Sequence, residues 1–589
     1  MNHANAAGEP GAANLRFARL LVDELQASGV VAAVVCPGSR STPLALAVAS
    51  QRGLPYRVHL DERSAAFHAL GYAKATGRPV ALVCTSGTAG ANFLPAVAEA
   101  SHARVPLVVL TADRPPELRA WGAAQTMEQR SLYAGFARWS EEAPCPSEGV
   151  GDGYARALAR RAVAEAMGAA PGPVHLNLPF REPLVPATID FESLAGAVAS
   201  AEFTPPVLEP RDPDGTIVRA LRSAKRGVLV FGPDAWDPSL ADAATSLAAA
   251  LGWPVVADPA SGLRAGNIVP DSLICHADLL LRHAATAAAL QPEVIVRFGG
   301  VPTPKAVNEW MACHPQAEVW LVDAAAGFRD PQHRAVRQLC LMPSQLAALV
   351  RAADVEPSTE ALAWRSRWRN ADRVAGSALT VALDGDARFL APQLARALWS
   401  GLPARSALYA ANSMAIRDLD AFAGPRAEPL RLLANRGVNG IDGLVSSALG
   451  AAQALRSPTV LWCGDLALLH DVSGLLAGRL HAADLTIVVS NDDGGGIFEY
   501  LPVARAVPRE VFEPLFAVPH GLDLCALARG LGWQATRVVS AEAFAAALSH
   551  AMAGGLHVIE VPMDRAANTA FHATINAEVR ERLRAELRR

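Results

Sequence analysis

The chain has 589 residues, of which 51% are hydrophobic and 6% aromatic, and its formal net charge is −4 at pH 7. This length is too great for one hydrophobic core and predicts roughly three or four domains. The slightly acidic balance excludes a general electrostatic attraction to nucleic acid or to an anionic membrane surface, so an acidic ligand would have to be held by local arginines.

The sequence predicts neither a signal peptide nor a membrane span. Residues 1–17 lack a basic region followed by an apolar one, and no apolar run reaches the roughly 18 residues of a membrane helix. The eight cysteines are scattered without a CxxC pair, and several lie inside apolar runs. This pattern favours reduced core cysteines and a cytoplasmic protein.

The first third of the chain alternates helix and strand signals. Residues 14–29 predict an amphipathic helix that ends at Gly29. Apolar runs then predict three buried strands, at 30–35, 79–87 and 106–115. Short apolar strands that alternate with helices predict βαβ units and a parallel sheet.

The same alternation returns twice. A proline-rich stretch at 205–215 predicts a linker, and the arginine-rich region around 351–375 predicts a second boundary. Eight more strands are predicted, at 227–233, 254–258, 293–300, 317–323, 406–413, 459–465, 485–492 and 557–562. The expected fold is therefore α/β, with three doubly wound parallel-sheet domains at 1–190, 205–355 and 375–589, and a terminal helix over 576–589.

Acidic turns follow two successive predicted strands of the last domain. Asp465 ends one apolar run, and the block 490–498, "SNDDGGGIF", ends the next. Loops at the carboxyl ends of parallel strands converge, and two carboxylates there would repel without a cation such as Mg²⁺ or Ca²⁺. The glycines at 494–496 would let the backbone approach a phosphate. A solvated loop is the alternative for an isolated GD dipeptide, but the paired motifs in this order favour a metal–phosphate site.

In these motifs, "GDLALLHD" and "SNDDGGGIF", the chain resembles the metal- and diphosphate-binding motif of thiamine diphosphate (ThDP) enzymes. More narrowly, it resembles the 2-succinyl-5-enolpyruvyl-6-hydroxy-3-cyclohexene-1-carboxylate (SEPHCHC) synthases of menaquinone biosynthesis. Four stretches carry this likeness: "CPGSRSTPLALA" (36–47), "HLDERSAAF" (59–67), "LTADRPPELR" (110–119) and "NRGVNGIDG" (435–443). The resemblance implies pyrimidine-binding, central and diphosphate-binding domains, in that order.

The resemblance also implies a reaction: ThDP-dependent decarboxylation of 2-oxoglutarate and 1,4-addition of the resulting succinyl carbanion to isochorismate, giving SEPHCHC and CO₂. It implies a homo-oligomer, dimer or tetramer, with active sites at the subunit interface, and no nucleic-acid partner. Two alternatives stay open. One is another ThDP enzyme, such as an acetohydroxyacid synthase or a 2-oxoacid decarboxylase, and the other is a non-catalytic α/β protein that binds nucleotide through the glycine-rich loop.

Cofactor-binding residues follow from the same likeness. Glu62, from a neighbouring subunit, is expected to stabilise the imino tautomer of the cofactor's pyrimidine ring, and Ile441 to bend the cofactor. Mg²⁺, or alternatively Mn²⁺, is expected on Asp465, Asp492 and the main-chain oxygen of Gly494. Asp492 stands where asparagine is usual among ThDP enzymes, which predicts tighter and more pH-dependent metal binding. Further cofactor contacts are implied at Ser413, Met414, Gly464, Leu466, Gly495, Ile497 and Phe498.

Both implied substrates are dianions, and arginine forks bind carboxylates bidentately. The arginines that follow apolar runs, and are expected to bind substrate, are Arg40, Arg114, Arg417 and Arg436. Arg40, Arg417 and Arg436 are also expected to act in catalysis, together with Gln125; for any one arginine, a surface ion pair is the alternative. Additional substrate contacts are expected at Ser39, Gln125, Ser413 and Lys305. The central domain's "VLVFGPDAW" lacks GxGxxG, so a structural or regulatory role is expected there.

Overall fold

The structure is a computed structural model that describes residues 10–191, 212, 215–233, 237, 239–266, 268–269, 271–325, 327 and 329–588. The predicted linker at 205–215 lies outside these ranges except for residues 212 and 215. Two compact units divide the chain. The first unit comprises Met1–Val207, Asn435–Arg456 and Leu469–Leu485, and the second comprises Leu208–Ala434, Ser457–Leu468 and Thr486–Arg589. Within the described ranges, no helix has both the length and the apolar character needed to cross a membrane.

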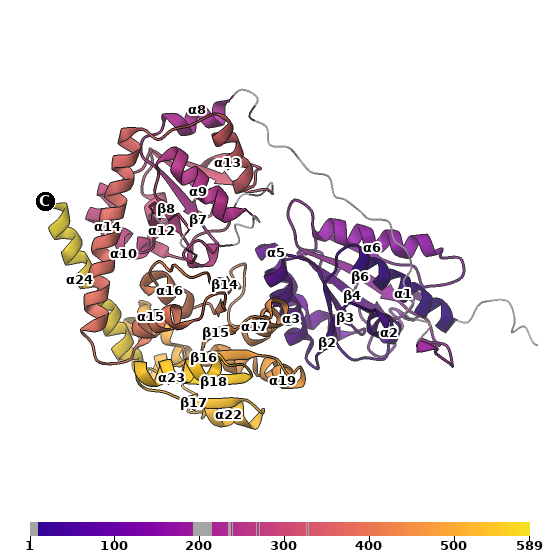
Figure 1. Cartoon of the computed structure of the whole chain (residues 1–589). Coiled ribbons are helices and arrows are strands. Elements are labelled where there is room, and N and C mark those ends of the chain that lie inside the picture. Colours follow the sequence, from indigo (N-terminus) through magenta and orange to yellow (C-terminus); the bar gives the residue numbers. More distant parts are fainter. Residues whose placement is uncertain are drawn as a thin grey trace, which may run out of the picture. The chain divides into compact units, whose positions relative to one another are not determined.

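The first unit contains one six-stranded sheet of parallel pairs, in the order β2-β1-β3-β4-β6-β5 (Figure 1). Its strands are β1 (Ala32–Val35), β2 (Tyr56–Val58), β3 (Val80–Cys84), β4 (Leu107–Asp113), β5 (Trp139–Glu142) and β6 (Pro173–Pro179). The three predicted strands are β1, β3 and β4, so those predictions are confirmed. Three strands of this sheet were not predicted. The edge strands β2 and β5 are only partly buried and lack a continuous apolar run. The buried strand β6 was missed because His175 and Asn177 interrupt its apolar run.

Helices cover both faces of this sheet. The first unit's helices are α1 (Pro10–Ala27), α2 (Thr42–Ser50), α3 (Glu62–Thr76), α4 (Thr88–Asn92), α5 (Leu94–Ala103), α6 (Asp152–Ala166), α17 (Leu444–Leu455) and α19 (Val472–Leu480). Ala33 and Val35 of β1 join a core with α1, α2 and α6. Ala32 and Val34 join a second core with α3 and α5. This alternation makes the sheet doubly wound, as predicted.

The second unit contains two six-stranded sheets, in the orders β12-β11-β10-β7-β8-β9 and β14-β13-β15-β16-β18-β17. The strands of the central sheet are β7 (Gly227–Phe231), β8 (Val255–Ala257), β9 (Leu273–Ile274), β10 (Val294–Phe298), β11 (Glu318–Val322) and β12 (Ala335–Leu339). The strands of the last sheet are β13 (Ala407–Ala410), β14 (Arg431–Ala434), β15 (Thr459–Gly464), β16 (Leu485–Asn491), β17 (Gln534–Arg537) and β18 (Leu556–Pro562). All eight strands predicted for this part of the chain are present.

The helices of this unit begin with α8 (Thr216–Ser223), α9 (Leu240–Leu251), α10 (Ala277–Leu281), α11 (Ala284–Ala289), α12 (Lys305–Ala312), α13 (Pro343–Ala352) and α14 (Thr359–Asp384). They continue with α15 (Ala391–Gly401), α16 (Met414–Phe422), α18 (Asp465–His470), α20 (Val503–Ala506), α21 (Arg509–Phe512), α22 (Leu524–Gly530), α23 (Ala541–Ala551) and α24 (Arg565–Leu587). The predicted terminal helix over 576–589 is the end of α24.

The arginine-rich region predicted as a boundary is a continuous helix, α14, of 26 residues. Trp364 and Trp368, four residues apart, bury one stripe of this helix, and the Trp364 indole N–H donates to Gly227 O at 2.9 Å. In Figure 1, α14 runs alongside α24, and the two helices pack together. The charged residues occupy the other faces of α14. Its polar composition therefore gives no sign in the sequence that one face of the helix is buried.

Candidate active site

Glu62 is the first residue of α3 and lies in the first unit. The Asp61 carboxylate caps this helix by accepting from the backbone N–H groups of Arg63 and Ser64, at 2.9 and 3.3 Å. Glu62 is half-buried. The pKa of the Cys84 thiol, at the end of β3, is raised by burial and then by the negative charge of the Glu62 carboxylate. Glu62 thus lies at the carboxyl edge of the sheet, where ligands collect in such folds.

A buried aspartate fixes the start of α3 against α17. Asp471 accepts from the Ser64 hydroxyl at 3.1 Å and from the Ser446 backbone N–H at 2.7 Å. Burial raises the pKa of Asp471 to about 6. Two residues after Glu62, the helix is therefore anchored by a hydrogen-bonded carboxylate, which holds the backbone from which Glu62 extends.

Arg40 lies in the turn that follows β1, beside the exposed Ser39. Arg40 is 7% exposed, and its guanidinium donates to Phe180 O at 2.9 Å and to the Glu182 carboxylate at 2.8 Å. The Glu182 side chain is 71% exposed, so this ion pair is open to solvent on the glutamate side. An incoming carboxylate could replace Glu182 without burying a new charge.

Arg114 follows β4 directly and shares the same sheet edge. It donates to the Ser86 hydroxyl and, at 2.9 Å, to Gln125 O. The Gln125 side chain donates back to Ser86 O at 3.1 Å. Burial and then the charge of Arg40 lower the pKa of Arg114. Two guanidiniums that repel each other at one edge favour binding of an anion between them.

The loop 435–443 carries Arg436 and Ile441, both half-buried and both in the first unit. The carboxylate of Glu99, on α5, accepts from three successive backbone N–H groups of residues 437–439, at 2.9, 2.6 and 2.9 Å. A Cβ at Gly437 would lie 2.8 Å from Glu99 Oε2, so glycine permits this close approach. Glu99, fully buried, was missed by sequence reasoning because a lone glutamate in an apolar helix carries no local signal.

The two acidic turns lie in the second unit, where β15 and β16 pair in parallel and place Gly464 opposite Ser490. Asp465, 1% exposed, accepts from the Gly494 backbone N–H at 2.7 Å. Burial raises its pKa. Burial, then the charges of Asp465 and Asp418, raise the pKa of Asp492 to about 8. The structure thus brings the predicted residues Asp465, Asp492 and Gly494 together.

These residues fit a divalent cation. Nearby buried carboxylates repel each other, and a hard cation with oxygen ligands would relieve that cost. The glycine loop is compact: Gly494 has a φ of +130°, and a Cβ there would lie 2.1 Å from Ala517 O. A Cβ at Gly496 would lie 2.5 Å from Asp492 Oδ2. Only glycines leave room for the backbone beside these carboxylates, as a phosphate cradle also requires.

Ser413 precedes α16 as its N-cap residue, and Met414 is the first residue of that helix, which follows β13. Ser413 adopts φ +65° and ψ −129°, a strained conformation for a residue other than glycine. The exposed Arg417 donates to Ser413 O. Lys305, by contrast, begins α12 beside the central sheet; its side chain is 87% exposed and pairs with Glu309 at 3.2 Å. It lies on a different sheet from the acidic turns.

His520 was not predicted. Its Nε2 lies 3.2 Å from Asp465 Oδ2, and its backbone N–H donates to the Asp493 carboxylate at 3.0 Å. A single histidine in a loop some 55 residues after Asp465 has no motif that could have identified it. The imidazole holds the Asp465 carboxylate and is therefore part of the candidate metal site.

Three family models match the chain. The N-terminal TPP binding domain of thiamine pyrophosphate enzymes matches residues 15–132, the middle domain of thiamine pyrophosphate matches 218–410, and the C-terminal TPP binding domain of these enzymes matches 421–561. A 2-succinyl-5-enolpyruvyl-6-hydroxy-3-cyclohexene-1-carboxylate synthase of Chloroflexus aurantiacus is 44% identical over 560 residues, 94% of each chain. The chain belongs to the SEPHCHC synthase family.

Other SEPHCHC synthases agree. That of Geobacillus kaustophilus is 44% identical over 577 residues, covering 96% of this chain and 97% of the relative. That of Myxococcus xanthus is 42% identical over 583 residues, with the same coverage. The family resemblance, the α/β fold of three parallel-sheet domains and the presence of ThDP-binding domains are thereby confirmed. The individual site residues, the metal and the oligomeric state stay predictions.

Proposed function

We propose that this protein catalyses the ThDP-dependent decarboxylation of 2-oxoglutarate and the 1,4-addition of the remaining four-carbon unit to isochorismate, which yields SEPHCHC and CO₂. The observation that carries this proposal is the identity of 38–44% to seven relatives named as SEPHCHC synthases, over nearly the whole chain. It is further supported by the two arginines at one sheet edge, which suit the carboxylates of both substrates.

Glu62 is the proposed partner of the cofactor's pyrimidine ring. Its carboxylate would hold a proton at the ring nitrogen and so favour the imino tautomer. The cap at Asp61 and the anchor at Asp471 keep Glu62 at a defined position. We assign this role across a subunit boundary, which makes a homodimer the smallest active form, and we place the enzyme in the cytoplasm.

Asp465, Asp492 and the main-chain oxygen of Gly494 would hold Mg²⁺, or Mn²⁺, and through it the diphosphate. When bound, ThDP supplies a nucleophilic carbon and an electron sink for the loss of CO₂. Ile441 would support the bent cofactor. The remaining proposed cofactor contacts are Ser413, Met414, Gly464, Leu466, Gly495, Ile497 and Phe498.

Substrate carboxylates are assigned to Arg40, Arg114, Arg417 and Arg436, with Ser39, Ser413 and Gln125 as hydrogen-bonding partners. Arg40, Gln125, Arg417 and Arg436 would also stabilise negative charge that develops during the reaction. Lys305 is retained only as a substrate contact of the central domain. The proposed domain limits are 1–190, 205–355 and 375–589.

Product analysis tests the proposal. Mass spectrometry of a mixture containing enzyme, ThDP, Mg²⁺, 2-oxoglutarate and isochorismate should detect SEPHCHC, and omission of isochorismate should abolish it. A matched incubation with pyruvate as the sole oxoacid tests the acetohydroxyacid synthase alternative. Acetolactate formation from pyruvate, with no SEPHCHC in the first mixture, would overturn the proposal.

A further inference from the structure

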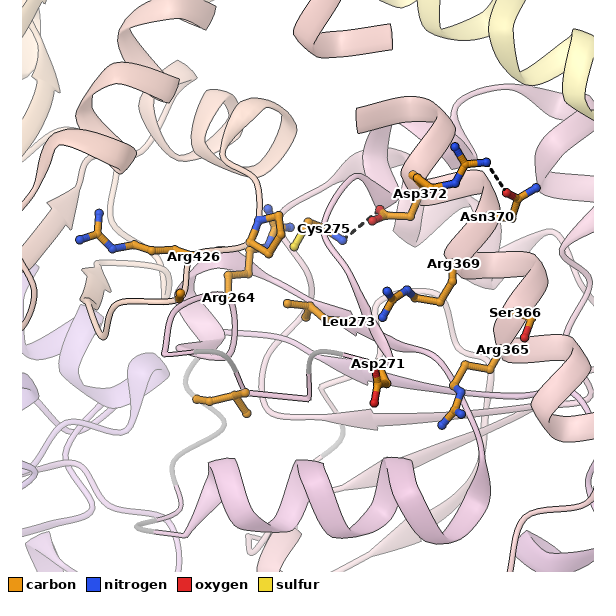
Figure 2. Close-up of a pocket in the computed structure, with 14 residues that line it drawn as sticks. Arg264, Asp271, Leu273, Cys275, Arg365, Ser366, Arg369, Asn370, Asp372 and Arg426 are labelled. Carbon is orange, nitrogen blue, oxygen red and sulfur yellow. Dashed lines mark hydrogen bonds between the residues drawn. The ribbon is translucent and has the colours of Figure 1, made fainter. Parts of the chain in front are cut away.

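The second unit contains a cavity of about 740 Å³ that shares no residue with the proposed catalytic set. Its walls come from three places: the middle of α14, residues 425–427 after α16, and five residues around β9, which are Arg264, Ile268, Asp271, Leu273 and Cys275 (Figure 2). Cavities between packed domains are preferred sites for small ligands. The chemistry of the lining decides which class of ligand this one can take.

The lining is strongly basic in a chain that is acidic overall. It contains five arginines and two aspartates. One of the aspartates, Asp372, is already engaged, because its carboxylate accepts from the backbone N–H groups of Cys275 and His276 at 3.1 and 2.8 Å. The His276 ring nitrogen also lies 3.1 Å from this carboxylate. Two acids outside the lining, Asp420 and Glu428, pair with Arg264 and Arg426. The five arginines outnumber these two carboxylates and the two lining aspartates by one.

Two of the arginines build the wall. Arg264, 2% exposed, donates to Ala257 O at 2.7 Å and pairs with the buried Asp420. Arg426 donates to Trp399 O and Leu402 O. Backbone hydrogen bonds of 3.0 Å join Arg426 N to Arg264 O and Gly266 N to Arg426 O. These hydrogen bonds hold this wall in place before a ligand binds, so binding would not have to immobilise it.

The other three arginines line the cavity from α14. Arg365, Arg369 and Arg373 are spaced by four residues and lie on one face of α14, with neighbouring Cβ atoms roughly 6 Å apart. Arg365 donates to the Ser272 hydroxyl across 3.4 Å, and Arg373 to the Asn370 side-chain oxygen at 2.7 Å. Both partners are neutral, so neither contact offsets a guanidinium charge. Figure 2 shows Arg365 and Arg369 extending from α14 toward Asp271 and Leu273 on the facing wall.

This spacing selects for more than one anionic group. One carboxylate or phosphate can engage one fork fully, and a row of forks along a helix face matches a ligand with several such groups. The opposite wall adds the apolar side chains of Ile268, Leu273 and Pro425. We propose that this cavity binds a small organic polyanion with a carbon frame, a class that includes tricarboxylates and phosphate esters.

Calorimetric titration of the ThDP- and Mg²⁺-loaded enzyme tests the site with two probes, tricarballylate and 3-phosphoglycerate, and with acetate as a single-charge comparison. At least one polyanion should bind at least about tenfold more tightly than acetate, with affinity falling as salt is added. Binding of tricarballylate alone assigns the site to polycarboxylates. Binding of 3-phosphoglycerate alone assigns it to phosphate esters.

The double variant Arg365→Gln/Arg373→Gln should weaken this binding by about tenfold or more, whereas turnover in the absence of the probe should be unchanged. Arg367→Gln is the matched control for the single variant Arg365→Gln, which should also weaken binding, because each removes one positive charge from the same helix and Arg367 is exposed outside the cavity. Arg365→Lys, which keeps the charge but loses the fork, should be intermediate. Dissociation constants above about 10 mM for both probes, or an equal loss in Arg367→Gln, would overturn the proposal.

Discussion

The Glu99 carboxylate accepts a hydrogen bond from the backbone N–H of Gly437, which lies 338 residues later in the sequence. It also accepts hydrogen bonds from the backbone N–H groups of the next two residues. No side-chain cation is needed to satisfy this buried acid, because three aligned amide dipoles point at it. The loop it holds carries Arg436 and Ile441, which are assigned to substrate and cofactor. Glu99 is therefore a positioning residue for that loop.

Glu99→Gln keeps the size of the side chain but turns one acceptor into a donor that faces backbone N–H groups. We expect the free energy of unfolding to fall by about 2 kcal/mol. We also expect kcat to fall by about tenfold or more, because Arg436 and Ile441 lose their position. Urea unfolding and steady-state kinetics measure both, with Glu165→Gln as control, since the Glu165 side chain is 41% exposed and lies on α6, outside the loop 435–443. Unchanged stability and kcat would show that the three amides do not depend on this carboxylate.

Glu62→Gln should leave the fold intact and reduce turnover by about 100-fold or more, since an amide cannot hold the proton at the pyrimidine nitrogen in the same way. Circular dichroism checks the fold, and SEPHCHC formation measures turnover. The comparison variant is Glu128→Gln, an exposed glutamate of the same unit that pairs with Arg130. Near-normal turnover in Glu62→Gln would contradict its assignment.

Asp492→Asn tests the extra carboxylate at the proposed metal site. The pKa of Asp492 is raised to about 8, so protons compete with the metal below that pH. Metal affinity of the unaltered protein should fall by about tenfold per pH unit from pH 8 downward. The variant lacks this titratable carboxyl group. Its metal affinity should be lower at pH 8 and should depend less on pH. Mn²⁺ titration at constant ThDP measures both quantities, and identical profiles would remove the idea.

Three histidines of the first unit make it sensitive to acid. The rings of His59, His68 and His481 lie within 6.0 Å of one another, centroid to centroid. Burial, then His481 and Arg57, lower the pKa of His59 to about 3. Burial likewise lowers the pKa of His68. Both rings therefore fold in the neutral form.

A histidine whose folded pKa is depressed stabilises the fold fully above its unfolded pKa of about 6.5, and that stability is lost as the pH falls toward the folded value. Protonation of His59 alone should lower the free energy of unfolding by about 2 kcal/mol between pH 7 and pH 5. In urea unfolding, the free energy of unfolding of His59→Leu should fall by about 2 kcal/mol less between pH 7 and pH 5 than that of the unaltered protein. The exposed His550→Leu should keep the original slope. Equal slopes in all three proteins would rule out the cluster as the cause.

Local sequence signals located the elements that they directly encode. The buried strands β3, β15 and β16 were predicted because their apolar runs are continuous, and Asp465 and Asp492 because each follows such a run. The region near 351–375, where a boundary is predicted, contains most of the helix α14. This helix was not predicted, because a helix whose tryptophans are buried by distant residues resembles a polar stretch when considered alone.

The sequence by itself thus determined the α/β class, the family and the residues at the strand ends, since periodicity and motif spacing are properties of neighbouring residues. Only the tertiary structure decided three relationships. Glu99 accepts hydrogen bonds from the loop at 437–439, and His520 contacts Asp465. Three arginines of α14 line a cavity. Each of these relationships joins segments far apart in the chain. They depend on how helices and strands pack, and no local pattern records that.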